Sequence, residues 1–256
     1  MIRAVLLDLS GVVYDGDTPI PGAVEAIARL RDAGLPIRFV SNTTRSPRQA
    51  IVAQLAGLGI AVSDGELLTP ANAAVAWLTA HGCSPHLLVH PDLEAEFSGV
   101  PTGELKAVVV GDAAEAFDYA AMNGAFRQLV DGAEFLALAT NRTFKDADGG
   151  LSLDAGAFIA ALEFAAGKQA IVLGKPSRDF FHAALAGLGC GPGDAVMVGD
   201  DMESDVAGAL RAGLGAGLLV RTGKYRPGDE GRFAPHPTAV VDDLTGAVDW
   251  ILRKRG

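Results

Sequence analysis

The feature that most constrains this chain is the alternation of short, almost wholly apolar runs with longer stretches of helical spacing. The run at 3–9 predicts a strand, the stretch at 22–34 a helix, the run at 36–42 a second strand and the stretch at 46–59 a second helix. Strands that are apolar on both faces are typical of parallel sheets, because helices cover both sides of such sheets. The sequence therefore predicts an α/β fold with a doubly wound parallel sheet.

The middle of the chain repeats this alternation on a smaller scale and then gives way to the first pattern again. We expect helices at 69–82, 117–132 and 154–167, strands at 86–90, 106–112 and 134–141, and a polar loop at 142–150. Further strands are expected at 169–174, 194–199 and 215–221. We therefore predict a core domain of residues 1–71 and 169–256, with a second α/β domain of residues 72–168 inserted in it.

Polar residues follow four of the predicted strands. They are Asp8; Ser41 and Asn42; Lys175; and Asp200, Asp201 and Asp205. The carboxyl ends of parallel strands share one edge of a sheet, and ligands bind at that edge. Residues far apart in the sequence are therefore expected to converge there.

This set of side chains suits phosphoryl chemistry. Mg²⁺ prefers oxygen ligands and usually takes one or two protein carboxylates, which Asp8 and Asp200 can supply. Lys175, the Ser41 hydroxyl and backbone N–H groups near Asn42 can hold phosphoryl oxygens. An ionised Asp8 can then attack phosphorus and form an aspartyl-phosphate, which water hydrolyses.

Each of these motifs also has an ordinary structural interpretation. A lone aspartate at a strand end is commonly a turn residue, and Asp200-Asp201 before a helix could be a simple N-cap. Ser41-Asn42 could be an ordinary turn and Lys175 part of a solvated loop. Only the joint arrangement, with each group at a strand end, favours a catalytic site.

Four short motifs resemble those of the haloacid dehalogenase superfamily of phosphohydrolases. They are "DLSG" at 8–11, "SNTT" at 41–44, "GKPS" at 174–177 and "GDDMESD" at 199–205. The stretch "VVYDGDTPIPGA" at 12–23 and the long insert between the second and third motifs resemble the subgroup with an α/β cap. The resemblance implies a Rossmann-like hydrolase core with an inserted α/β cap domain, and a Mg²⁺-dependent phosphatase.

The resemblance also implies roles for individual residues. Asp8 would be the nucleophile and a metal ligand, the Ser10 carbonyl and Asp200 would be further metal ligands, and Asp205 or Asp201 would orient Lys175 or water. The substrate-binding residues would be Asp8, Leu9, Ser10, Ser41, Asn42 and Lys175. Asn141, in the loop after a predicted strand of the insert, is a further candidate substrate contact.

Ser10 departs from the usual pattern of the superfamily, which has a second aspartate at this position. A serine hydroxyl is a poor general acid or base near neutral pH, and such help is typically worth about 10²–10⁴-fold. Its loss should matter least where the leaving group departs easily. We therefore hypothesise a bias toward phosphohistidine, phospholysine and pyrophosphate.

Composition narrows the possible partners and the cellular compartment. The net charge of −10 argues against general binding to nucleic acid or to an anionic membrane. Residues 67–91 contain no charged Asp, Glu, Lys or Arg, but prolines, Asn72 and Gly82 interrupt them, which argues against a membrane span. Two cysteines in no metal-like spacing favour free thiols in the cytoplasm. Small phosphorylated molecules and phosphorylated protein side chains are the expected substrates, and a homodimer is possible.

Three alternatives differ from this interpretation. The first is a general sugar- or nucleotide-phosphate phosphatase of the same fold. The second is a signalling receiver domain, which is expected to be about half as long and to carry its acidic pair early in the chain. The third is a weakly active or non-catalytic phosphate-binding relative.

Overall fold

The computed structural model describes residues 1–145 and 150–255 and contains two compact units. Unit 1 consists of residues 1–41, 51–68 and 175–256, and unit 2 of residues 42–50 and 69–174. The units differ from the predicted domains in the short segment 42–50 and by several residues at each border. The identity of these units with a core and a cap stays a prediction.

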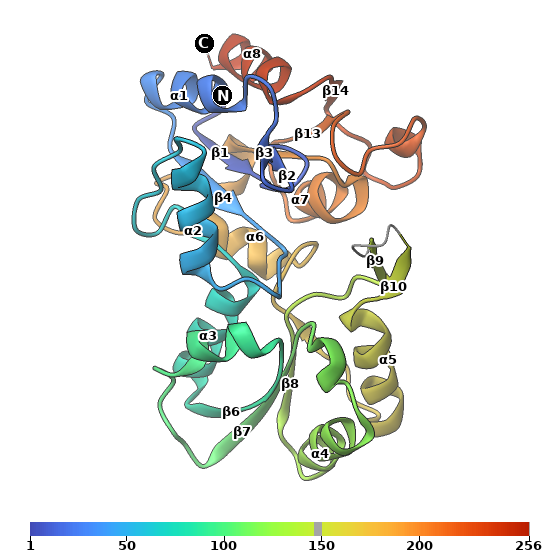
Figure 1. Cartoon of the computed structure of the whole chain (residues 1–256). Coiled ribbons are helices and arrows are strands. Elements are labelled where there is room, and N and C mark those ends of the chain that lie inside the picture. The colour runs from blue at the N-terminus through green and yellow to red at the C-terminus, as the bar shows by residue number, and fades with distance from the viewer. Residues whose placement is uncertain (146–149, 256) are drawn as a thin grey trace. The chain divides into compact units, whose positions relative to one another are not determined.

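Unit 1 is built on a six-stranded parallel sheet (Figure 1). In spatial order its strands are β14 (Ala239–Val241), β13 (Ala216–Val220), β12 (Ala195–Gly199), β1 (Ala4–Leu7), β4 (Ile37–Val40) and β5 (Leu67–Leu68). The chain order runs outward from β1 on one side and outward from β12 on the other. The switch point of the sheet therefore lies between β1 and β12, where open α/β sheets bind ligands.

Helices cover both faces of this sheet because its strands are apolar on both faces. They are α1 (Ala23–Asp32), α2 (Arg48–Gly57, whose first turn belongs to unit 2), α6 (Arg178–Leu185), α7 (Gly208–Arg211) and α8 (Leu244–Lys254). Leu218 packs in one cluster with Ile27 of α1 and Val248 of α8, whereas its neighbour Leu219 packs against Val206 on the other face. A short hairpin of β2 (Tyr14–Asp15) and β3 (Thr18–Pro19) follows β1.

Unit 2 has its own four-stranded parallel sheet. Its spatial order is β11 (Ile171–Val172), β8 (Glu134–Ala137), β7 (Leu105–Val110) and β6 (Cys83–Leu88). Helix α3 (Pro70–His81) packs on the face that carries Val109, and α4 (Tyr119–Val130) and α5 (Ala155–Ala166) pack on the face that carries Val108. The predicted α/β class and parallel, doubly wound architecture are confirmed.

Two local expectations were wrong. The run at 169–174 was expected to form a strand of the core domain. Its strand pairs instead with β8 of unit 2, with Ile171 opposite Leu136. The prediction failed because a short apolar run fits either sheet equally well. The loop expected at 142–150 contains β9 (Thr143–Lys145), which pairs antiparallel with β10 (Leu151–Leu153) directly after that loop, and residues 146–149 lie outside the described ranges. No helix in the described ranges is long and apolar enough to cross a membrane.

Candidate active site

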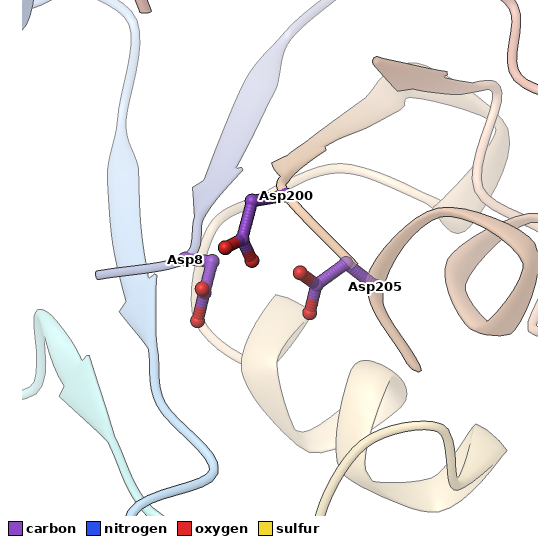
Figure 2. Close-up of side chains that lie close together, drawn as sticks. All are labelled: Asp8, Asp200 and Asp205. Atoms are coloured by element: carbon purple, nitrogen blue, oxygen red, sulfur yellow. The ribbon is translucent and has the colours of Figure 1, made fainter. Parts of the chain in front are cut away.

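Three carboxylates meet at the carboxyl edge of the six-stranded sheet (Figure 2). Asp8 directly follows β1, Asp200 directly follows β12, and Asp205 lies in the helical turn Met202–Ala207. One oxygen of each carboxylate lies within 4.8 Å of the others, and all three residues are buried. The cluster thus lies at the switch point of the sheet.

Lys175 lies between two of these acids. Its ammonium nitrogen is 2.5 Å from Oδ1 of Asp8 and 2.7 Å from Oδ1 of Asp205. The same nitrogen donates a hydrogen bond to the carbonyl of Val40 at 3.4 Å, one residue before Ser41. Lys175 thus joins the ends of three chain segments, although it follows β11 of unit 2 and not a strand of this sheet.

The charges in this group shift one another's pKa values. Burial alone would lower the pKa of Lys175, but the charges of Asp205 and Asp8, and their hydrogen bonds, outweigh it and the pKa is raised. Burial raises the pKa of Asp205, against the opposing charge of Lys175. Lys175 is therefore an ammonium ion at neutral pH, and its charge offsets part of the acidic cluster.

Asp200 experiences the crowding of negative charge most directly. Burial and then the charge of Asp8 raise its pKa to about 7, although a backbone hydrogen bond from Lys224 opposes this shift. The pKa of Tyr14 is also raised, to about 12, by burial and then by the charge of Asp8. A cation beside Asp8 and Asp200 would relieve this repulsion.

The loop after β13 supports Asp200 directly. The backbone N–H of Lys224 donates to Oδ2 of Asp200 at 2.7 Å, and the Thr222 hydroxyl donates to the carbonyl of Gly11. A Cβ on Gly11 would lie 2.1 Å from Oδ2 of Asp200 and 2.8 Å from the Cα of Gly223. The two glycines therefore allow the two loops to approach closely around Asp200.

This loop is a part of the site that sequence reasoning undervalued. From the sequence alone, the basic and then acidic stretch at 220–230 favours a solvated loop that could border the site. Its support of Asp200 comes from a backbone N–H group, which every residue except proline carries. No residue type or spacing could therefore have revealed it.

Asp201 differs from Asp200 and Asp205 in its role. Its Oδ1 accepts hydrogen bonds from the backbone N–H groups of Glu203 and Ser204, each at 3.0 Å, and so caps the turn that carries Asp205. Of the two acids considered as partners of Lys175, Asp205 is the one at ion-pair distance. The helix-cap interpretation thus applies to Asp201.

The other expected site residues lie as follows. Leu9 is fully buried in the hydrophobic core, so its side chain is not available to a ligand. Ser10 is exposed and forms an isolated bridge with Tyr14. Ser41 follows β4 and is buried, and its N–H donates to the carbonyl of Leu68 at 3.1 Å.

Two expected site residues, Asn42 and Asn141, belong to unit 2. Asn42 begins the segment 42–50 of that unit. The Asn141 carbonyl accepts a hydrogen bond from the N–H of Gly156 at 3.0 Å, and its side chain bonds to the buried Asp154. The convergence expected from strand ends thus holds in unit 1 for Asp8, Lys175, Asp200 and Asp205.

The comparisons with known proteins agree with this geometry. Residues 5–100 match the family described as haloacid dehalogenase-like hydrolase, and residues 172–247 match the one described as HAD-hydrolase-like. A phospholysine phosphohistidine inorganic pyrophosphate phosphatase from Danio rerio is 46% identical, covering 99% of this chain and 96% of its own. The chain belongs to the haloacid dehalogenase-like hydrolase family.

Other members of the family are similar over the same length. Haloacid dehalogenase-like hydrolase domain-containing protein 2 from Homo sapiens is 44% identical, covering 98% of this chain and 96% of its own. The structure of a p-nitrophenyl phosphatase from Archaeoglobus fulgidus superimposes with a TM-score of 0.89 at 26% identity, covering 97% of this chain and 99% of its own. This member of the haloacid dehalogenase-like family is a hydrolase that acts on phosphate esters.

Proposed function

We propose that this phosphatase requires Mg²⁺ and works through an aspartyl-phosphate on Asp8. The observation that carries the proposal is the cluster of Asp8, Asp200 and Asp205 around Lys175. Its donors are carboxylate oxygens, the ligands that Mg²⁺ prefers. Burial and then the charge of Asp8 raise the pKa of Asp200, and a cation at this place would favour its ionised form. When bound, Mg²⁺ supplies positive charge to the phosphoryl oxygens.

Each protein group has a defined task in this proposal, and Asp8 has two. Asp8 attacks phosphorus, and Asp8, the Ser10 carbonyl and Asp200 hold Mg²⁺. Lys175 neutralises charge on the phosphoryl oxygens, and Asp205 holds Lys175 in place. These groups are fixed before substrate arrives, so little reorganisation is needed during the reaction.

Substrate binding is shared between side chains and backbone. The residues proposed for it are Asp8, Leu9, Ser10, Ser41, Asn42, Lys175 and Asn141. Ser41 and Asn42 bind the phosphoryl group, whereas Leu9 contributes through its backbone, because its side chain is buried. Asn141 is a candidate contact for the leaving group, and its bond to Asp154 would fix the orientation of its amide.

We further propose a preference for activated phosphoryl groups, namely phosphohistidine, phospholysine and pyrophosphate. Ser10 supports it, because the serine hydroxyl cannot efficiently protonate a basic leaving group. The name of the relative from Danio rerio points to the same substrates. The second candidate is a general sugar- or nucleotide-phosphate phosphatase, which the p-nitrophenyl phosphatase structure favours, and a weakly active or non-catalytic relative is the third.

The same reasoning extends to partners and location. Phosphorylated protein side chains are proposed substrates, because phosphohistidine and phospholysine occur on proteins. Exposed apolar side chains of unit 2, such as Tyr119, Val130 and Phe164, support a homodimer. A cytoplasmic location is supported by Cys83 and Cys190, which are both free thiols.

A substrate panel tests the proposal. Phosphate release is measured from pyrophosphate, imidodiphosphate, p-nitrophenyl phosphate and an alkyl phosphate, with and without Mg²⁺. We expect Mg²⁺-dependent release, fastest for the labile bonds, and a loss of at least about 10³-fold in Asp8→Asn. Asp179→Asn, an exposed position on α6, is the matched control. Equal activity of Asp8→Asn and the unchanged protein would refute the mechanism.

A further inference from the structure

The segment that carries two of the proposed phosphoryl-binding residues crosses from one unit to the other. We define the 41–45 loop as Ser41 to Arg45. Ser41 closes β4 of unit 1, and Asn42 onward belongs to unit 2. Ser41 is held by its bond to Leu68 in unit 1, whereas the position of Asn42 depends on what residues 42–45 contact in unit 2.

Arg45 anchors this loop in unit 2 through two contacts. Its Nε lies 2.5 Å from Oδ2 of Asp112, whose side chain is only 8% exposed. Its guanidinium carbon lies 4.4 Å from the centre of the Phe144 ring, in a cation–π arrangement. A planar guanidinium held at one edge by a carboxylate and on one face by a ring has little freedom to turn.

Asp112 itself is held rigidly and also contacts the loop through its backbone. Its Oδ1 accepts the N–H of Ala114 at 2.9 Å, which fixes the carboxylate. Its N–H donates to the hydroxyl of the buried Thr44 at 3.4 Å. Asp112 thus contacts two consecutive residues of the 41–45 loop, from a position 67 residues away from Arg45 in the chain.

Asn42 is the first residue of the loop that belongs to unit 2. It packs closely against Gly174, where the chain leaves unit 2 again. A Cβ on Gly174 would lie 2.8 Å from Oδ1 of Asn42 and 2.4 Å from the carbonyl of Leu138. Gly174 directly precedes Lys175. Both segments that lead to proposed phosphoryl-binding groups are therefore packed together in unit 2.

We propose that Asp112 is a positioning residue for phosphoryl binding, which acts through Arg45 to hold the 41–45 loop in the geometry that receives a phosphoryl group. This inference rests on the proposed role of Ser41 and Asn42. A purely structural role would suit the bond to Ala114, which resembles a helix cap, but it leaves the contact with Arg45 unexplained. That ion pair contributes little to stability, because the Arg45 side chain is 43% exposed.

Asp112→Asn tests the inference, because the amide oxygen can still accept from Ala114 while the charge that holds Arg45 is lost. We expect the dissociation constant of orthophosphate, measured by calorimetry with Mg²⁺ present, to rise about three- to thirtyfold. The Mg²⁺ concentration for half-saturation should not change, because the proposed metal ligands lie in unit 1. Asp118→Asn is the matched control, since Asp118 caps α4 through Ala121 and is in the same unit.

A double-mutant cycle shows whether Asp112 acts through Arg45. The double variant with Arg45→Met should bind orthophosphate no more weakly than either single variant. Unchanged orthophosphate affinity in Asp112→Asn, additive effects, or a parallel loss of Mg²⁺ affinity would each overturn the inference. If Asp112→Asn does not fold, Arg45→Met carries the affinity test by itself.

The proposed function is tested separately from this inference. If the proposed function is wrong, Asp8→Asn and the unchanged protein release phosphate at the same rate. Failure of the inference alone shows as a wild-type enzyme that depends on Asp8 and an Asp112→Asn variant that binds orthophosphate normally.

Discussion

The ammonium nitrogen of Lys175 lies 2.5 Å from Oδ1 of Asp8, although 167 positions separate the two residues in the chain. The same nitrogen is 2.7 Å from Oδ1 of Asp205. One buried cation therefore lies between two buried carboxylates. The stability and the chemistry of the site both depend on this balance of charge and on the packing around it.

Lys175→Met should destabilise the protein strongly. The substitution leaves two buried carboxylates without their cation, a change that costs about 3–5 kcal/mol when one partner of a buried pair is removed. Unfolding in urea at about pH 8 measures the loss. Lys168→Met is the control, because Lys168 pairs with Glu134 at a partly exposed site and should lose under about 1 kcal/mol.

The loss in Lys175→Met should be smaller in mild acid. Burial already raises the pKa of Asp205, and removal of Lys175 raises it further. The folded state then binds protons that the unfolded state does not bind, so its stability increases as the pH falls toward the usual pKa of an aspartate. Urea unfolding at about pH 6 checks this, and a loss equal to that at about pH 8 would contradict it.

The stabilisation by Mg²⁺ should increase with pH. Asp200 has a pKa of about 7 in the folded protein, raised by burial and by Asp8, so this group lowers stability as the pH rises from its usual pKa of about 4 toward 7. Below about pH 7 a cation has to displace the proton of Asp200, whereas above about pH 7 it relieves the repulsion between Asp200 and Asp8. The increase in melting temperature on adding Mg²⁺ should therefore be larger at about pH 8 than at about pH 6. In Asp200→Asn the difference should disappear.

Ser10→Asp should change substrate preference in favour of poor leaving groups. A carboxyl group at this exposed position can donate and accept a proton, which a serine hydroxyl does poorly near neutral pH. We expect kcat/KM for an alkyl phosphate to rise at least about tenfold relative to kcat/KM for imidodiphosphate. Parallel kinetics on the two substrates measure the ratio. An unchanged ratio would mean that position 10 is not the acid–base position.

Gly11→Ala should weaken Mg²⁺ binding by displacing Asp200. The new methyl group would lie 2.1 Å from Oδ2 of Asp200, and Gly11 also has a φ of +80°. Gly16→Ala is the matched control, because Gly16 has a φ of +56° but no atom within 4 Å of the added Cβ. Both variants should lose about 1–3 kcal/mol from backbone strain. Only Gly11→Ala should need more Mg²⁺ for half-maximal activity.

Residues of strong local character were predicted well. Thr69 caps α3 by accepting from the N–H of Asn72 at 3.2 Å, and Gly82 ends that helix with a φ of +63°, as the sequence indicates. Asp8 and Asp200 follow buried strands, and their expected approach depends only on the parallel order of β1 and β12. The cap and the end of α3 are predictable because neighbouring residues in the chain determine them, and the approach of Asp8 to Asp200 is predictable because parallel strands of one sheet end at the same edge.

The parts that were missed depend on partners distant in the chain. Val172 belongs to a run that is apolar enough for either sheet, and only packing against β8 decides between them. The support of Asp200 comes from the backbone of Lys224, so no side chain indicates it. At the end of a predicted strand, Asp112 is most simply interpreted from the sequence as a helix cap, and its contact with Arg45 is a tertiary one that no local pattern indicates.

By itself the sequence determined the α/β class, the family and the acids that end β1 and β12, because hydrophobic periodicity and short motifs act locally. The tertiary structure alone decided that Asp205 and not Asp201 pairs with Lys175, and that Lys175 reaches the site from a strand of the other sheet. The physical reason is that an ion pair depends on separation in space. Asp201 and Asp205 are close together in the chain and chemically identical, and yet they contact different partners in the folded protein.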